Sequence, residues 1–176
     1  MPALDRYTGV LYDAFDAAAL LPVSRSFAHE HVVIHSAMFG LVRAADPIPA
    51  YRLSHDSRLP AVSLKKAWRG AISAELVAQP GLVLDLRSEA YRELGPAPRA
   101  VFVRVVARGG DGTRRALNHF NKKGKGEFVR EIVECGIPHP NVESLLGWAH
   151  ERGIELVHGL PGELELTVDE ITGPRR

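Results

Sequence analysis

The chain has 176 residues, of which 45% are hydrophobic and 24% are charged, the balance of a soluble globular protein about one domain long. No window approaches the roughly 18 to 20 uncharged apolar residues that a membrane span requires, and residues 1–6 lack the apolar region of a signal peptide. A single cysteine, Cys135, excludes an internal disulfide and suits a reducing compartment, so we expect a cytoplasmic protein. The formal net charge of +1 is too small to bind polyanions by bulk electrostatics. Any contact with nucleic acid must therefore come from a local cationic patch.

The first third of the chain predicts a helix, a strand and a long extended connection. Residues 9–21 carry apolar side chains at helical spacing, and residues 31–36 are a short β-branched run typical of a buried strand. Residues 37–43 are expected to form a helical turn. Two prolines make residues 46–53 extended, and long ordered connections of this kind are often functional.

The middle of the chain alternates helix and strand. Residues 63–78 form an amphipathic pattern with Ser63 as a plausible N-cap. A second buried strand is expected at 81–86, followed by a short helix at 88–94. Alternation of this kind favours layers of helices and strands.

Glycine-rich residues 109–112 separate two strand-like runs, which predicts a β-hairpin and therefore a mixed sheet. The remaining expected elements are helices at 128–134 and 141–151 and strands at 154–157 and 163–168. Together the elements predict an α/β fold, a single-domain mixed β-sheet flanked by helices, with an α+β arrangement as the alternative. We expect one domain over residues 1–172 and a flexible tail at 173–176.

The segment 119–130 concentrates four cations and one acid within twelve residues and includes two glycines. Glycine lets backbone amides approach a phosphate closely at the start of a helix. A helix-hairpin-helix element uses the same chemistry to hold the DNA backbone without reading bases. The alternative is a solvent-exposed loop whose charges contribute only to solubility.

Two further clusters could line a small-ligand pocket. Tyr51 and Arg52 offer a phenol and a guanidinium fork, and Asp85, Ser88 and Tyr91 could supply acid and base groups where a strand ends. Each cluster also has a purely structural interpretation. In the second cluster, Ser88 would cap a helix and Tyr91 would pack behind it.

Several catalytic signatures are missing from the sequence, including Gly-x-Gly-x-x-Gly, the Walker loop and the Gly-x-Ser-x-Gly elbow. The eight histidines show no metal-ligand spacing, so we expect no metal and no cofactor. Cys135 would be peroxide-sensitive only if it were exposed with a depressed pKa, and packing is the favoured role.

Five blocks in a fixed order resemble the YaaA family of bacterial peroxide-stress proteins. The blocks are residues 7–12, 36–43, 46–53, 84–91 and 118–126, and the match runs from about residue 7 to residue 170. This resemblance implies a cytoplasmic protein that protects against hydrogen peroxide by limiting free iron and oxidative DNA damage. It also implies binding of double-stranded DNA through a helix-hairpin-helix-like element. By resemblance and by charge, the DNA-binding residues are Asn121, Lys122, Lys123, Gly124, Lys125, Gly126 and Arg130.

The chain also departs from the family pattern, because typical members begin with an additional stretch that includes a first strand and a Pro-rich loop. This departure suggests a short paralogue, a misplaced start codon or an inactive truncated copy. The sequence is therefore compatible with three functions: a monomeric DNA-binding protein, an enzyme acting on a nucleotide or nucleobase, and an inactive remnant. In the enzyme, a small nucleotide-like ligand would be surrounded by Tyr51, Arg52, Asp85, Ser88, Tyr91 and His119.

Overall fold

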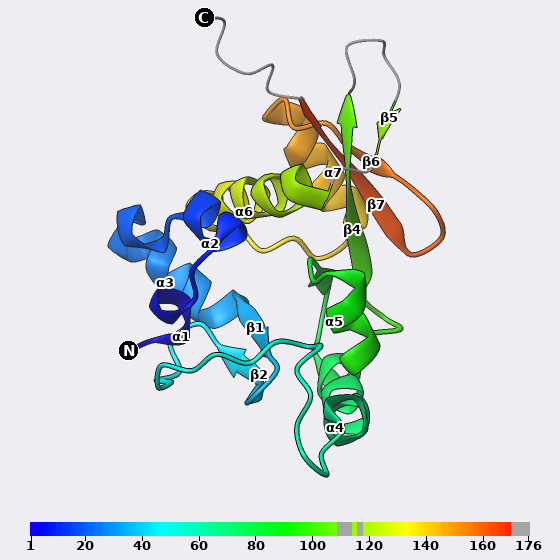
Figure 1. Cartoon of the computed structure of the whole chain (residues 1–176). Coiled ribbons are helices and arrows are strands. Elements are labelled where there is room, and N and C mark those ends of the chain that lie inside the picture. The colour runs from blue at the N-terminus through cyan, green and yellow to red at the C-terminus, as the bar shows by residue number, and fades with distance from the viewer. Residues whose placement is uncertain (109–113, 116–117, 170–176) are drawn as a thin grey trace, which may run out of the picture.

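The computed structural model describes residues 1–108, 114–115 and 118–169 (Figure 1). These residues form a two-stranded sheet, β1-β2, and a larger mixed sheet in the order β3-β4-β7-β6, with β5 paired to β4. Helices flank both sheets, so the predicted α/β class with a mixed sheet is confirmed. The proposed domain limits of 1–172 remain a prediction, and the tail at 173–176 lies outside the described residues.

The N-terminal part contains several short helices where the sequence predicted one longer helix. It contains α1 (Ala3–Arg6), α2 (Val10–Phe15), the 3-10 helix η1 (Ala17–Ala19) and α3 (Pro22–His31). The predicted helix over 9–21 is interrupted because Asp16 takes a left-handed conformation with φ 50°. The whole of α3 was missed, although Pro22 at its first turn is a recognised helix start.

Strands β1 (Val33–Ser36) and β2 (Gly40–Arg43) form an antiparallel hairpin. The helical turn predicted for 37–43 is therefore wrong. Gly40 adopts φ +72°, and a Cβ built on it would lie 2.8 Å from the ring of Trp68. A glycine at this position allows both the turn and the packing of α4 against the hairpin.

The long connection leads to α4 (Leu64–Ala78), β3 (Leu84–Asp85) and α5 (Glu89–Leu94). Ser63 and Ser88 each accept a hydrogen bond from a backbone N–H one turn ahead, which confirms the predicted N-caps of α4 and α5. The buried strand expected over 81–86 is shorter than predicted, with only Leu84–Asp85 paired.

The larger sheet is built around β4 (Val101–Arg108), which runs parallel to β3 on one side and to β7 (Glu163–Asp169) on the other. Strand β6 (Leu156–His158) pairs antiparallel with β7, and β5 (Arg114–Arg115) pairs antiparallel with β4, as the predicted hairpin requires. The glycine-rich turn of that hairpin lies outside the described residues.

Helix α6 (Asn118–Cys135) lies between the N-terminal helices and the larger sheet, with α7 (Val142–Glu151) beside it (Figure 1). Phe128 belongs to the apolar core under the sheet, whereas Val133 belongs to the core formed with α1, α3 and the β1-β2 hairpin. One helix therefore contributes to both cores. Among the described residues, no helix has the length and apolar character to cross a bilayer.

Candidate functional site

The predicted basic hairpin is a helix in the structure. The backbone is helical from Asn118 to Cys135, so the helix-hairpin-helix-like element expected around residues 122–126 is wrong. The two glycines allow close packing instead of a turn. A Cβ on Gly124 would lie 2.7 Å from Val168, and one on Gly126 would lie 2.2 Å from the carbonyl oxygen of Leu11. Glycine is needed here because α6 approaches both the sheet and α2 closely.

The cations of this segment occupy different environments. Lys122 is exposed, and the half-exposed Lys123 lies 3.4 Å from Glu127, one turn ahead. The Arg130 guanidinium lies 3.2 Å from Asp16 and 2.9 Å from Glu134, which joins α6 to the end of α2. Lys125 is only 3% exposed. Of the cations predicted to bind DNA, Lys122 and Lys123 thus remain the accessible pair.

Lys125 belongs to a buried polar cluster centred on Asp85. The Asp85 carboxylate accepts hydrogen bonds from Arg87 Nε at 2.8 Å and Arg87 Nη2 at 2.7 Å, and Arg92 Nε lies 3.5 Å from it. The amine of Lys125 donates to the carbonyl oxygen of Arg87 at 3.2 Å and lies 4.6 Å from the ring centre of Phe102. Burial lowers the pKa of Lys125 to about 8 because desolvation disfavours the ammonium.

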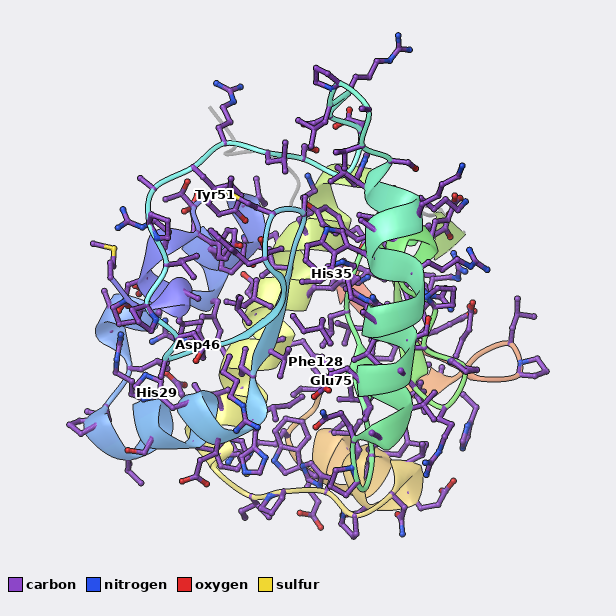
Figure 2. All side chains as sticks on the ribbon, turned by 90° about the horizontal axis from the view of Figure 1, so that it is seen from below. His29, His35, Asp46, Tyr51, Glu75 and Phe128 are labelled. Carbon is purple, nitrogen blue, oxygen red and sulfur yellow. The ribbon has the colours of Figure 1, made fainter. Side chains whose placement is uncertain are left out.

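Histidine 35 extends this cluster toward the β1-β2 hairpin, and Figure 2 shows it near the middle of the molecule. Its Nδ1 lies 3.1 Å from Nη1 of Arg87, and its Nε2 is buried without a partner in the described part of the chain. Burial, and then the positive charge of Arg87, lower the pKa of His35 to about 4. The imidazole is therefore neutral at pH 7, and its Nδ1 accepts from the guanidinium.

The four tyrosines of the chain lie near one another, and one of them, Tyr91, contacts His35. The hydroxyl of Tyr51 lies 2.5 Å from that of Tyr7 and 2.6 Å from that of Ser36. Tyr7 stacks on Tyr12, and the ring of Tyr91 meets His35 edge to face at 5.2 Å. Burial raises the pKa of Tyr7, Tyr12 and Tyr91, so these phenols stay protonated at neutral pH.

The structure separates the predicted pocket residues into two groups. Tyr51, Asp85 and Tyr91 lie in or beside the buried clusters, whereas Arg52 is exposed and Ser88 caps α5. His119 lies in the first turn of α6, and its side chain is outside the described residues.

Sequence reasoning missed His35, Arg87, Ser36, Tyr7 and Tyr12. All five lie within the family-like blocks or beside them, and this position could have identified them as candidate site residues. Over the described ranges, no group of three or more His, Cys, Asp or Glu side chains is placed to hold a metal ion. Cys135 is partly buried at the end of α6.

The fold and these clusters define an α/β protein with a buried Asp-Arg-Lys and tyrosine network beside a helix that carries exposed lysines. More particularly, the chain belongs to the family described as "Peroxide stress protein YaaA", whose model matches residues 1–152. The predicted family resemblance is thereby confirmed.

Similar proteins from three bacteria support this assignment. A "UPF0246 protein" of Corynebacterium glutamicum is 43% identical over 159 residues, which cover 88% of this chain and 63% of the relative. One from Corynebacterium efficiens is 47% identical over 138 residues, covering 76% and 55% of the two chains. One from Streptomyces coelicolor is 38% identical over 184 residues, covering 97% of this chain and 70% of the relative. The chain thus spans less than two thirds of the length of the Corynebacterium relatives.

Proposed function

We propose that this member of the peroxide-stress family binds the phosphate backbone of double-stranded DNA and limits oxidative DNA damage. The proposed link to intracellular iron control is supported by the family relationship alone. Lys122 and Lys123, in the N-terminal half of α6, are the proposed contacts, together with the preceding strand β5.

The distribution of charge along the chain supports this proposal. Residues 114–125 contain five Lys or Arg residues and no acid, in a chain whose net charge is only +1. The remainder of the protein is therefore net negative, and positive charge is concentrated in this segment. A local cluster of positive charge attracts the phosphates of DNA but does not discriminate between bases.

The structure also limits what the segment can do. Lys125 is buried, and Gly124 and Gly126 are occupied by packing, so the proposal does not include a phosphate cradle of backbone amides at these positions. Binding should depend on exposed lysines and lack strong sequence preference.

Fluorescence anisotropy with a short labelled duplex tests the proposal. The Lys122→Ala/Lys123→Ala variant should weaken binding at low salt at least tenfold. A Lys66→Ala/Arg69→Ala variant provides the matched control, because it removes the same charge from exposed positions on α4. Equal loss in both variants, or no binding by the unmodified chain, would refute a contact surface on α6.

A second candidate function is binding of a nucleotide-like ligand, with or without catalysis. It is favoured by the convergence of Tyr51, Tyr91 and Asp85 with the neutral His35 in one partly buried region. Polar and perturbed groups gathered in this way are typical of ligand sites. Thermal-shift measurements with mononucleotides on the unmodified chain and Tyr51→Phe would test it, and a stabilisation that Tyr51→Phe abolishes is the expected result. An equal shift in both proteins would exclude Tyr51 as a ligand contact.

A further inference from the structure

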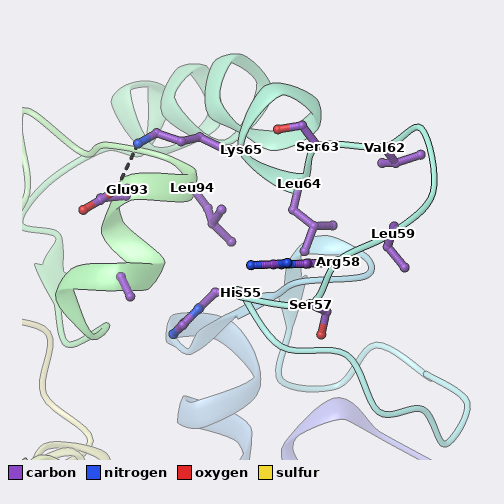
Figure 3. Close-up of a pocket in the computed structure, with 11 residues that line it drawn as sticks. His55, Ser57, Arg58, Leu59, Val62, Ser63, Leu64, Lys65, Glu93 and Leu94 are labelled. Atoms are coloured by element: carbon purple, nitrogen blue, oxygen red, sulfur yellow. Dashed lines mark hydrogen bonds and ion pairs between the residues drawn. The ribbon is translucent and has the colours of Figure 1, made fainter.

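A cavity of about 430 Å³ lies where the long connection meets α4 and α5 (Figure 3). Its floor is apolar and consists of Leu64 and Leu94, which are 7% and 4% exposed. Its rim is polar and includes Ser57, Ser63 and three basic side chains, His55, Arg58 and Lys65. The volume falls within the range of small-molecule sites.

Arg58 is the most informative residue of this cavity. It is exposed, and it makes no hydrogen bond or ion pair within the part of the chain that the structure describes. Figure 3 shows its side chain reaching across the cavity toward His55, below Leu64 and Leu94. A guanidinium directed over an apolar floor is available to form a bidentate contact with an anion.

Two serine hydroxyls complement this cation. The oxygen of Ser57 accepts from the Ser54 N–H at 2.9 Å, and the oxygen of Ser63 accepts from the Lys66 N–H at 3.3 Å. Each hydroxyl keeps its own O–H to donate to a ligand. The cavity therefore presents a guanidinium fork and two hydroxyl donors.

The charges around the cavity also favour an anion. Lys65 is held at 2.9 Å from Glu93 on the opposite wall, which neutralises that pair. His55 lies 3.8 Å from the carboxylate of Asp56. Arg58 is therefore the cation of the cavity lining that has no ion-pair partner among the described residues. A carboxylate has two acceptor oxygens, whereas a phosphomonoester has three, which matches the fork and both hydroxyls better.

We propose that this cavity, which we name the Arg58 cavity, binds the phosphate group of a small phosphomonoester. The Leu64 and Leu94 floor would contact the apolar part of the molecule that carries the phosphate. This site lies on the connection and on α4 and α5, so the inference does not depend on DNA binding by α6.

Titration followed by amide NMR tests the proposal, with inorganic phosphate and AMP as separate probes. Both probes should shift the amides of Ser57, Ser63 and Leu64, and tighter binding of AMP would show that the organic part contributes. Arg58→Gln should weaken binding by about tenfold or more. Arg43→Gln is the matched control, because Arg43 is an exposed arginine at the end of β2 that does not line the cavity.

Three results would overturn the inference. These are no amide shifts at about 10 mM phosphate or AMP, shifts confined to α6, and equal affinity in Arg58→Gln and the unmodified chain. The duplex-binding assay on Arg58→Gln separates the two proposals, since DNA affinity should be unchanged whether or not the cavity binds phosphate.

Discussion

The substitution Asp85→Asn should destabilise the protein strongly although it changes almost no volume. The Asp85 side chain is 4% exposed, and its carboxylate pairs with Arg87 at 2.7 Å and with Arg92 at 3.5 Å. The amine of Lys125 is also buried nearby. Asparagine would leave these cations without their shared counterion, a loss that typically costs about 3 to 5 kcal/mol. That is a large part of the roughly 5 to 15 kcal/mol that stabilises an ordinary domain.

Urea denaturation followed by tryptophan fluorescence measures this effect. The exposed carboxylate of Asp56 supplies the control, because Asp56→Asn should leave the free energy of unfolding nearly unchanged. Adding Lys125→Met to Asp85→Asn should restore part of the loss, since it removes one uncompensated charge. A loss below about 1 kcal/mol for Asp85→Asn would refute the structural role of this carboxylate.

Four further substitutions, one of them a control, test other parts of the account by the same denaturation assay. Gly126→Ala should cost about 1 to 3 kcal/mol, because its Cβ would lie 2.2 Å from the carbonyl oxygen of Leu11. Gly147→Ala, where a Cβ meets nothing within 4 Å, should be neutral or stabilising, and equal losses would contradict the packing argument. The pKa of His35 is about 4 in the folded protein and 6.5 ordinarily, so its contribution is lost as pH falls from 6.5 toward 4. His35→Gln should therefore lose less stability over that interval, and an unchanged slope of stability against pH would contradict the lowered pKa. Ser63→Ala should cost about 1 kcal/mol through loss of the α4 cap, and no change would contradict the capping role.

Local chemistry made part of the fold predictable. Ser63 and Ser88 were recognised as caps because the capping signal lies within one helical turn of sequence. The pairing of β4 with β5 followed from the glycines between two strand-like runs. The family blocks placed Tyr51 and Asp85 near the site, and the structure brings both into the polar clusters.

The errors have a common cause in long-range packing. Gly124 and Gly126 predict a loop from sequence alone, yet they lie in a helix because the sheet and α2 approach it closely. Burial of Lys125 was equally unpredictable, since it depends on Asp85 and Phe102 from other elements. The contact of His35 with Arg87 joins residues 52 positions apart, and no local pattern encodes it.

The salt dependence of DNA binding tests the central proposal most directly. The slope of log affinity against log salt concentration should be negative for the unmodified chain. It should become shallower by about 2 in Lys122→Ala/Lys123→Ala, because each lost phosphate contact removes about 0.9. Binding that is independent of salt, or a slope that the variant leaves unchanged, would contradict phosphate contact by the exposed lysines of α6.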